Sequence, residues 1–256
     1  MAPPHEPRRE PADPPAPRGH RGLHPQDARL FLPPEQVARL REAAADLAWL
    51  LERDYAPDAS LKLVGDRYRL RQRQRMALRR SVCAPSRAAA RRARCLSVAA
   101  LRGRSVMVDG LNQLITLEVA FSGGIVLRGN DGALRDLASV HGTYRLVRET
   151  PRAAEALGAW LARAGATSVT LLLDAPVSNT GRMATLLREL AAHRGWPWEV
   201  TLVPAADPLL KAADGVVATS DGGILDAGVA WLDLAGAVVR QAVPDARVLD
   251  LWGEDR

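Results

Sequence analysis

Three aspartates stand at the ends of short hydrophobic stretches, where carboxylates can gather around a cation. The stretches VMVD, TLLLD and VVATSD end at Asp109, Asp174 and Asp221, and Asp207 opens the segment before the last of them. A single aspartate in such a place is commonly a turn residue. Several carboxylates at one edge, however, repel one another unless protons or a cation relieve the repulsion. We therefore predict that these four aspartates ligate a metal ion.

The ligand type indicates the metal and the reaction. The candidate ligands are all carboxylates, and the five histidines and two cysteines form no ligand pattern. Oxygen ligands of this kind favour Mg²⁺ or Mn²⁺, which take one or two carboxylates together with phosphate oxygens of a substrate. Such an ion activates water and stabilises the leaving oxygen when a phosphodiester is cleaved. The expected chemistry is phosphodiester hydrolysis.

Strands must position these aspartates, and the pattern after residue 99 predicts an open, mainly parallel α/β sheet. The hydrophobic runs are continuous, as expected for strands covered on both faces, and helical segments separate them. Ligands bind at the carboxyl ends of the strands in such sheets, so the aspartates should meet at one edge. The predicted strands are 105–109, 168–174, 198–204 and 215–221, and the predicted helices are 151–165, 181–195 and 207–214.

Three further segments carry less regular patterns. A strand pair is predicted over 115–127, interrupted by Ser122, Gly123 and Gly124, which signal a hairpin. A short helix is predicted within 130–144. A short helix or turn, followed by an edge strand or hairpin, is predicted over 225–239.

Composition and charge divide the chain into three parts. Residues 1–25 are rich in Pro, Arg and Gly and predict a disordered tail, residues 26–98 predict a basic helical domain, and residues 99–256 predict the α/β domain. In the helical domain, apolar residues three and four apart predict a helix from residue 34 to about 55, and a third, alanine-rich helix is expected around 86–94. Residues 1–95 hold 20 Arg or Lys against 11 Asp or Glu. This excess points toward a polyanion such as nucleic acid.

Four arginines in the basic part are spaced four residues apart. If 60–83 is one helix, they share one ridge. A solvated face and a nucleic-acid contact both remain open, although the stretch from Lys62 to Arg94 has 12 basic residues and a single acid, Asp66. The four candidate substrate-binding residues are Arg67, Arg71, Arg75 and Arg79.

Two other stretches contain candidate substrate-binding residues. Ser178, Asn179 and Thr180 precede a predicted helix, where they either cap it or bind a phosphate through free backbone amides, with Arg182 adding charge. The second stretch forms either a structural salt-bridge network or part of the site, with Arg128 or Arg135 on a phosphate and Asp136 toward the metal. Its polar residues are Arg128, Asn130, Asp131, Arg135, Asp136, His141, Tyr144 and Arg145.

VMVDGLN resembles the first strand motif of the PIN and NYN nuclease superfamily, in which an apolar strand ends in Asp-Gly-x-Asn or Asp-x-Asn. AADPLLKAADGVVATSDGGIL resembles the later half of that superfamily's pattern. The resemblance implies that Asp109, Asp207 and Asp221 are catalytic metal ligands, supported by Asn112 and Ser220. It also implies an acid on the second helix, for which the candidates are Asp136 and, more weakly, Glu118.

Two further resemblances concern the rest of the chain. The stretches HPQDARLF, LVGDRYRLRQRQRMALRR, VDGLNQLITLE, LRGNDGALRDLASVHGTYR and LLDAPVSNTGR are similar to a prokaryotic family called domain of unknown function 434, which implies a relationship but no activity. An aspartate followed by a small polar loop and Gly-Arg is similar to Toprim domains, which cut or join phosphodiesters with Mg²⁺. Toprim sites have a glutamate at an earlier strand end, where this chain has Asp109.

The sequence as a whole predicts a Mg²⁺- or Mn²⁺-dependent nuclease that acts on RNA in preference to DNA. Two alternatives stay open: a non-catalytic nucleic-acid-binding protein on a PIN-like fold, and a Toprim-like or nucleotide-binding protein. No run of about 18 apolar residues is present, and the N-terminus lacks the apolar core of a secretory signal. We therefore expect a cytoplasmic protein without a membrane span.

Overall fold

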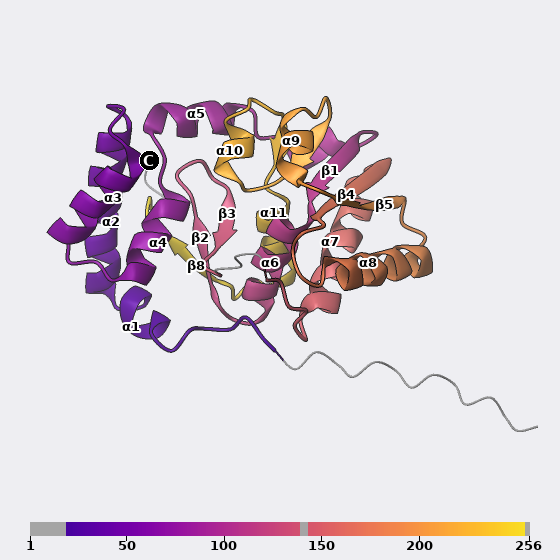
Figure 1. Ribbon diagram of the computed structural model, residues 1–256, viewed down its shortest axis with the longest axis horizontal. Coiled ribbons are helices and arrows are strands. Elements are labelled where there is room, and N and C mark those ends of the chain that lie inside the picture. The colour runs from indigo at the N-terminus through magenta and orange to yellow at the C-terminus, as the bar shows by residue number, and fades with distance from the viewer. Residues whose placement is uncertain (1–18, 139–142, 254–256) are drawn as a thin grey trace, which may run out of the picture.

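The computed structural model describes residues 19–138 and 143–253, and a parallel sheet of five strands forms its larger half (Figure 1). The strand order is β5-β4-β1-β6-β7, with every neighbouring pair parallel. The prediction of a mainly parallel α/β protein is confirmed. The strands are β1 (Ser105–Asp109), β4 (Ser168–Asp174), β5 (Trp198–Val203), β6 (Val216–Ala218) and β7 (Trp231–Leu232).

Helices cover both faces of this sheet, because successive strand residues point to opposite sides. Leu171 and Leu173 of β4 pack in one core with helices α6, α7, α8 and α11, whereas Leu172 packs in another with α9 and α10. Burial on both faces explains the unbroken hydrophobic runs of the inner strands, such as β4 and β6, whereas the edge strand β5 is partly exposed. The helices are α6 (Gly110–Phe121), α7 (Thr150–Ala164), α8 (Thr180–Arg194), α9 (Ala206–Lys211), α10 (Gly222–Leu225) and α11 (Leu234–Ala242).

A second, three-stranded sheet joins the N-terminal helices to the rest of the protein (Figure 1). Its strands are β3 (Leu134–Asp136), β2 (Ile125–Arg128) and β8 (Arg247–Asp250), in that order. Ile125 and Leu127 share one core with Leu40 of α2 and Leu78 of α4, so the basic helical part completes its core with strands from the later part of the chain. The N-terminal helices are α1 (Asp27–Phe31), α2 (Pro34–Leu51), α3 (Pro57–Arg67), α4 (Gln72–Ser81) and α5 (Pro85–Ala93), and a 3₁₀ turn, η1 (Val98–Leu101), precedes β1.

The strongly periodic segments adopt the structures that were predicted for them. The predictions over 34–55, 86–94, 151–165, 181–195 and 207–214 correspond to α2, α5, α7, α8 and α9. The strand predictions correspond to β1, β4, β5 and β6, although β6 ends at Ala218, three residues before Asp221. Helix α7 ends at Gly165, whose φ of 77° is left-handed, as expected for a glycine at this position.

The strand pair predicted over 115–127 is wrong in its first half. Residues 110–121 form helix α6, and β2 (Ile125–Arg128) alone is extended. An apolar run broken by a hairpin signal suggested two strands, but α6 is buried on nearly every side, including at Leu114, Leu117 and the polar Thr116. A helix buried all round shows no amphipathic period, so a short apolar run does not distinguish it from a buried strand.

Two other predictions are wrong, and a third is incomplete. The described part of 130–144 contains strand β3 instead of a helix, paired antiparallel with β2 across a turn at Gly132, which has a φ of 90°. Residues 60–83 form two helices, because a turn in which Arg69 has a φ of 51° separates α3 from α4. In 225–239 the turn after Leu225 and the edge strand β7 agree with the prediction, but helix α11, which follows β7, was not predicted.

The end of the predicted disordered tail, residues 19–25, packs against the α/β part. Arg21 donates a hydrogen bond of 2.6 Å from Nε to Glu118 Oε2 and a second, of 3.0 Å, to the Arg145 carbonyl. The backbone N–H of Arg148 donates to the Gly19 carbonyl at 3.0 Å. Arg21 and Gly19, which lie within the predicted tail, are therefore held by contacts with the rest of the protein. In the described ranges, every helix is too short or too polar to cross a membrane.

Candidate functional site

The strand order places Asp109 and Asp221 at the point where ligands bind in open α/β sheets. From β1 the chain adds β4 and β5 on one side, then crosses back to add β6 and β7 on the other. The crevice between β1 and β6, at their carboxyl ends, is therefore the topological switch point. Asp109 is the last residue of β1, and Thr219, Ser220 and Asp221 follow β6 directly.

One hydroxyl links these two acids, which are called the acidic pair below. Thr219 Oγ1 donates a hydrogen bond of 2.8 Å to Asp109 Oδ2 and accepts one of 3.1 Å from the Asp221 backbone N–H. Asp109 is only 8% exposed. The pKa of Asp109 is raised to about 7, chiefly by burial and also by the charges of Asp221 and Asp207, while hydrogen bonds from Thr219 and from the Asn112 backbone oppose the shift. The first predicted ligand is thus a buried carboxyl that is costly to ionise without a nearby positive charge.

Asn112 and Ser220, the predicted supporting residues, hold the loop after β6 in place. Asn112 Oδ1 accepts two hydrogen bonds of 3.0 Å, from the backbone N–H and from the hydroxyl of Ser220. Asp221 then caps α10, since its Oδ1 accepts from the N–H groups of Gly223 at 2.8 Å and Ile224 at 3.1 Å. These bonds set the position of the exposed Asp221 carboxylate relative to α6 and β1.

The other two predicted metal ligands have partners of their own, although the charge of Asp207 still acts on Asp109. Asp174 Oδ1 accepts a 2.8 Å hydrogen bond from the Ala206 N–H and so holds the start of α9. The Asp207 side chain is 57% exposed and lies 3.6 Å from Lys211 Nζ. No three His, Cys, Asp or Glu side chains within 19–138 and 143–253 come together in a metal-binding arrangement. The predicted set of four ligands is therefore not formed.

The acidic pair alone still fits the metal that was predicted. Mg²⁺ commonly uses one or two protein carboxylates and keeps water or phosphate oxygens as its other ligands. Asp109 and Asp221 are oxygen donors, and the raised pKa of Asp109 has the crowding of negative charge among its causes. A two-carboxylate site at the switch point is consistent with this donor set.

A polar pocket of about 390 Å³, called the site pocket below, adjoins the acidic pair. Asn112, Ser220 and Asp221 form one wall of it. Asp109 does not line the pocket but is connected to this wall through Thr219, which hydrogen-bonds both to Asp109 and to the backbone of Asp221. The opposite walls come from the end of α4, from α5 and from the β2–β3 hairpin, and their charged residues are Arg79, Arg80, Arg91, Asp131, Arg135 and Asp136.

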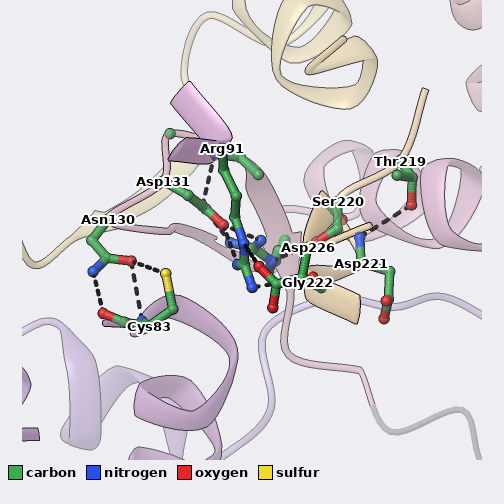
Figure 2. A network of polar contacts seen from close by, with 12 residues as sticks. Cys83, Arg91, Asn130, Asp131, Thr219, Ser220, Asp221, Gly222 and Asp226 are labelled. Atoms are coloured by element: carbon green, nitrogen blue, oxygen red, sulfur yellow. Dashed lines mark hydrogen bonds and ion pairs between the residues drawn. The ribbon is translucent and has the colours of Figure 1, made fainter. Parts of the chain in front are cut away.

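A buried ionic network fixes these walls relative to one another (Figure 2). The Asp131 carboxylate accepts a hydrogen bond of 2.7 Å from Arg91 Nη1 and two more, of 2.7 and 2.8 Å, from the two Nη atoms of Arg135. Burial alone would raise the pKa of Asp131, but the two arginines lower it to about 2. Arg135 Nε also donates to the Ser220 carbonyl at 2.7 Å, and Arg91 donates to the Gly222 carbonyl at 3.1 Å and to Asp226 at 2.8 Å. The hairpin and α5 are thereby tied to the loop that carries Asp221.

Both candidates for a second-helix acid have other partners. Asp136 lines the site pocket from strand β3, not from a helix, and its Oδ1 lies 2.9 Å from Arg80 Nη1. Glu118 is fully buried on α6, where Arg21, Thr150 and Tyr144 donate hydrogen bonds to it. Burial raises the pKa of Glu118, and these hydrogen bonds oppose the shift. Asp136 is placed near the acidic pair, whereas Glu118 has a structural role.

The remaining candidate substrate-binding residues lie on other elements than the acidic pair. Arg128 Nε lies 3.4 Å from Asp250 of β8. Asn179 is the N-cap residue of α8 but does not cap it, since its Nδ2 donates to the Tyr144 carbonyl at 2.7 Å and its φ is 65°. Thr180 Oγ1 likewise donates to the Val177 carbonyl at 2.8 Å. Ser178 pairs with Thr143 in an isolated β-bridge, Arg182 is exposed, and His141 lies outside the described residues.

The arginine ridge is not formed, because the turn at Arg69 separates Arg67 from Arg75 and Arg79. These arginines also have acidic neighbours from other parts of the chain. Arg67 lies 3.6 Å from Asp46, and Arg75 lies 2.7 Å from Asp66. Arg79 pairs with Asp58 and also borders the site pocket. Two of these three acidic partners, Asp46 and Asp58, lie outside the basic stretch from Lys62 to Arg94, so the composition of that stretch did not indicate them.

Sequence reasoning missed several residues at the site. Thr219 stands inside the motif VVATSD, so its place between two aspartates was a visible signal. Arg80 and Arg91 were two arginines among many, and nothing in their spacing marked them. Asp131 was noted within a polar stretch but was not assigned to the site. The role of Arg91, for example, depends on contacts with Asp131 and Asp226, which are 40 and 135 positions away along the chain.

The fold and site define a parallel α/β protein with a buried strand-end carboxyl at its switch point and an arginine-lined pocket beside it. The chain belongs to the family described as Domain of unknown function (DUF5616), whose model matches residues 98–237. The model of a second family, Protein of unknown function (DUF434), matches residues 39–94 and confirms the resemblance to that family.

One curated relative covers most of the chain. An uncharacterised protein of Methanocaldococcus jannaschii is 28% identical over 186 residues, which cover 73% of this chain and 88% of the relative. The alignment is therefore long enough to include parts of both matched regions. No solved structure matches the chain.

Proposed function

We propose that this protein is a Mg²⁺- or Mn²⁺-dependent nuclease of PIN-like type that hydrolyses phosphodiester bonds, with RNA as the favoured substrate. The observation that carries the proposal is the buried carboxyl of Asp109 at the switch point, with its pKa raised to about 7 by burial and by the charges of Asp221 and Asp207. A perturbed acid beside a polar pocket is a candidate functional group. The PIN and NYN resemblance of VMVDGLN supports the same assignment.

The acidic pair would hold the cation, which when bound supplies Lewis acidity toward phosphate oxygens. Asp109 contributes a carboxylate oriented by Thr219, and Asp221 contributes one held at the pocket wall by its bonds to α10. Asn112 keeps the Asp221 loop against α6 through Ser220. In the overall reaction, water adds its oxygen to phosphorus, one phosphorus–oxygen ester bond breaks, and the released oxygen takes a proton.

The arginines of the site pocket would bind the phosphates of the substrate strand. Arg135 uses three hydrogen bonds, one from each guanidinium nitrogen, to contact Ser220 and Asp131. A guanidinium has five N–H groups, so two remain on its Nη atoms. Arg80 has a side chain that is 30% exposed beside Asp136. These guanidinium groups have a geometry that suits phosphate oxygens.

The test compares wild type with Asp109→Asn and Asp221→Asn, and uses Asp214→Asn as a control. Asp214 is exposed and lies near the site in sequence, so it matches the change of charge. Mn²⁺ binding is measured by calorimetry, and cleavage of labelled RNA and DNA oligonucleotides is followed on the same samples. We expect saturable Mn²⁺ binding and metal-dependent cleavage in wild type and in Asp214→Asn, and loss of both in the two site variants. Cleavage of both substrates at equal rates would contradict the RNA preference.

A non-catalytic nucleic-acid-binding protein is the second candidate, and two observations favour it. In the described part of the chain no third carboxylate joins the acidic pair in a metal-binding group, and the pocket arginines already have carboxylate or carbonyl partners. In that case RNA would bind without cleavage, and Asp109→Asn would leave binding unchanged. Wild-type protein that binds RNA but neither binds Mn²⁺ nor cleaves would establish this second function.

A further inference from the structure

A second basic hollow lies away from the acidic pair, on the N-terminal helices. It has a volume of about 380 Å³ and is formed by α1, α2, the turn between α3 and α4, and the start of α4. We call it the arginine pocket, after the four arginines that line it. They are Arg29, Arg39, Arg69 and Arg71.

These four arginines differ from their neighbours in having no acidic partner. In the same helices, Arg67, Arg73 and Arg75 lie within 2.5 to 3.6 Å of Asp46, Asp27 and Asp66. Across residues 19–138 and 143–253, no carboxylate lines the arginine pocket, and none forms an ion pair with its four arginines. Arg29, Arg69 and Arg71 are exposed and Arg39 is half-buried, so solvent screens their repulsion, and an anion in the hollow would meet four positive charges at once.

Gln74, which is buried, and Gln36, which is half-buried, hold the walls of the arginine pocket in place. Gln74 is fully buried, and its Nε2 donates to the Leu30 carbonyl at 3.0 Å and to Gln36 Oε1 at 3.2 Å. Gln74 Oε1 accepts the backbone N–H of Arg71 at 3.0 Å. Gln36 Oε1 also accepts a hydrogen bond from Arg39 Nη2. The pocket is thus a fixed arrangement in which two amides connect α1, α2 and α4.

The backbone and one buried donor add to this positive character. Arg71 is the N-cap residue of α4, a ten-residue helix, so the positive end of the helix dipole lies at the wall. Arg39 Nε is buried and has no hydrogen-bond partner among the described residues. Its guanidinium therefore has unused donor capacity beside the pocket.

We infer that the arginine pocket is a phosphate-binding site, separate from the acidic pair and independent of the proposed nuclease activity. The ligand class is a tetrahedral oxyanion with at least two oxygens for guanidinium groups, which is the chemistry that arginine forks recognise. Such a phosphate has two sources, the backbone of a bound nucleic acid or a free phosphate. The shared chemistry is the proposal, and the experiment below distinguishes the sources.

The test uses the full chain in EDTA, so that the metal-binding acidic pair plays no part. The variant is the double substitution Arg69→Asn and Arg71→Gln. Asparagine tolerates the left-handed backbone of Arg69, so the change removes charge without adding strain. The control is Arg104→Gln, an exposed arginine just before β1, at the opposite edge of the main sheet from Asp109. Thermal unfolding of each protein verifies that it is folded.

Two probes are titrated into each protein: inorganic phosphate by calorimetry, and a 12-nucleotide RNA by fluorescence anisotropy at several salt concentrations. For a free-phosphate site we expect saturable phosphate binding that weakens by roughly tenfold or more in the double variant and not in the control. For a backbone-phosphate site we expect a salt slope that falls by about 0.7 per lost contact. The arginine pocket is not a phosphate site if the double variant binds each probe as tightly as wild type does. The same conclusion follows if Arg104→Gln weakens the binding of the probes as much as the double variant does.

Discussion

Thr219 Oγ1 donates a hydrogen bond of 2.8 Å to Asp109 Oδ2, which joins the ends of two neighbouring parallel strands, β1 and β6. The bond stabilises the ionised form of a carboxyl that burial otherwise keeps protonated. Because Thr219 also accepts the Asp221 N–H, one hydroxyl both lowers the pKa of the buried acid and helps to hold the loop that carries the exposed one.

Replacement of Thr219 by valine should raise the pKa of Asp109 above its value of about 7, because the hydrogen bond to the ionised form is lost. A hydrogen bond to a charged group contributes about 1.5–3 kcal/mol, so the rise should be about one unit or more. Carboxyl-carbon NMR in metal-free buffer measures this titration. Thr219→Ser retains the hydroxyl and serves as the control, and an unchanged Asp109 titration in Thr219→Val would contradict the assigned role.

Asp109→Asn should make the metal-free protein more stable at pH 8.5 than wild type, and the gain should be smaller at pH 5. The folded-state pKa of Asp109 is raised, so the folded protein binds more protons than the unfolded chain between about pH 4 and 7. The stability contributed by protonated Asp109 is complete below its unfolded pKa and is lost as pH rises through about 7. The stability that is lost can reach about 4 kcal/mol, because each unit of difference between the folded and unfolded pKa corresponds to about 1.4 kcal/mol.

Denaturant unfolding at the two pH values in EDTA measures this difference. Asp214→Asn, at an exposed site, controls for the change in net charge. Equal effects of Asp109→Asn at both pH values would show that the carboxyl is not protonated in the folded protein.

Asp131→Asn should destabilise the protein by about 3–5 kcal/mol, because Arg91 and Arg135 would keep buried charges without their shared partner. The pKa of Asp131 is lowered to about 2, so its contribution is present above its unfolded pKa and is lost as pH falls through about 2. Asp58→Asn is the control, since Asp58 pairs with Arg79 at an 82% exposed position. That change should cost less than about 1 kcal/mol. Similar losses for the two variants in urea unfolding at pH 7 would refute the buried network.

Gly110→Ala should destabilise the protein through a steric conflict next to Asp109. A Cβ at residue 110 would lie 2.7 Å from Leu173 Cδ2 and 2.8 Å from the Leu172 carbonyl, so β4 or α6 would have to shift. We expect a loss of about 1–3 kcal/mol. Gly181→Ala in α8 is the matched control, because its Cβ would meet no atom within 4 Å, and it should stabilise the helix by up to about 1 kcal/mol. Equal unfolding midpoints for the two variants would contradict the close approach.

Some features of this protein followed from the sequence because local physics determines them. Helix α2 and strand β4 have apolar patterns of the right period and length, and Gly165 ends α7 as a left-handed glycine should. The meeting of Asp109 and Asp221 also followed, since parallel strands bring their carboxyl ends to one edge. Helix α6 could not be predicted from the sequence, because burial on all sides removes the hydrophobic period that distinguishes a helix from a strand.

Tertiary structure alone decided which charges are free and which are engaged. Asp174 stands at the same sheet edge as Asp109, yet the Ala206 N–H engages it. Arg67 and Arg75 have partners that no local pattern indicates, whereas Arg29, Arg39, Arg69 and Arg71 surround a hollow without an acid among the described residues. The physical reason is that a charge's role depends on its nearest neighbours in space, and many of these neighbours lie far away in the chain. Local patterns are enough to place the strands that carry the acids, but long-range contacts settle which of those acids and arginines remain available for a ligand.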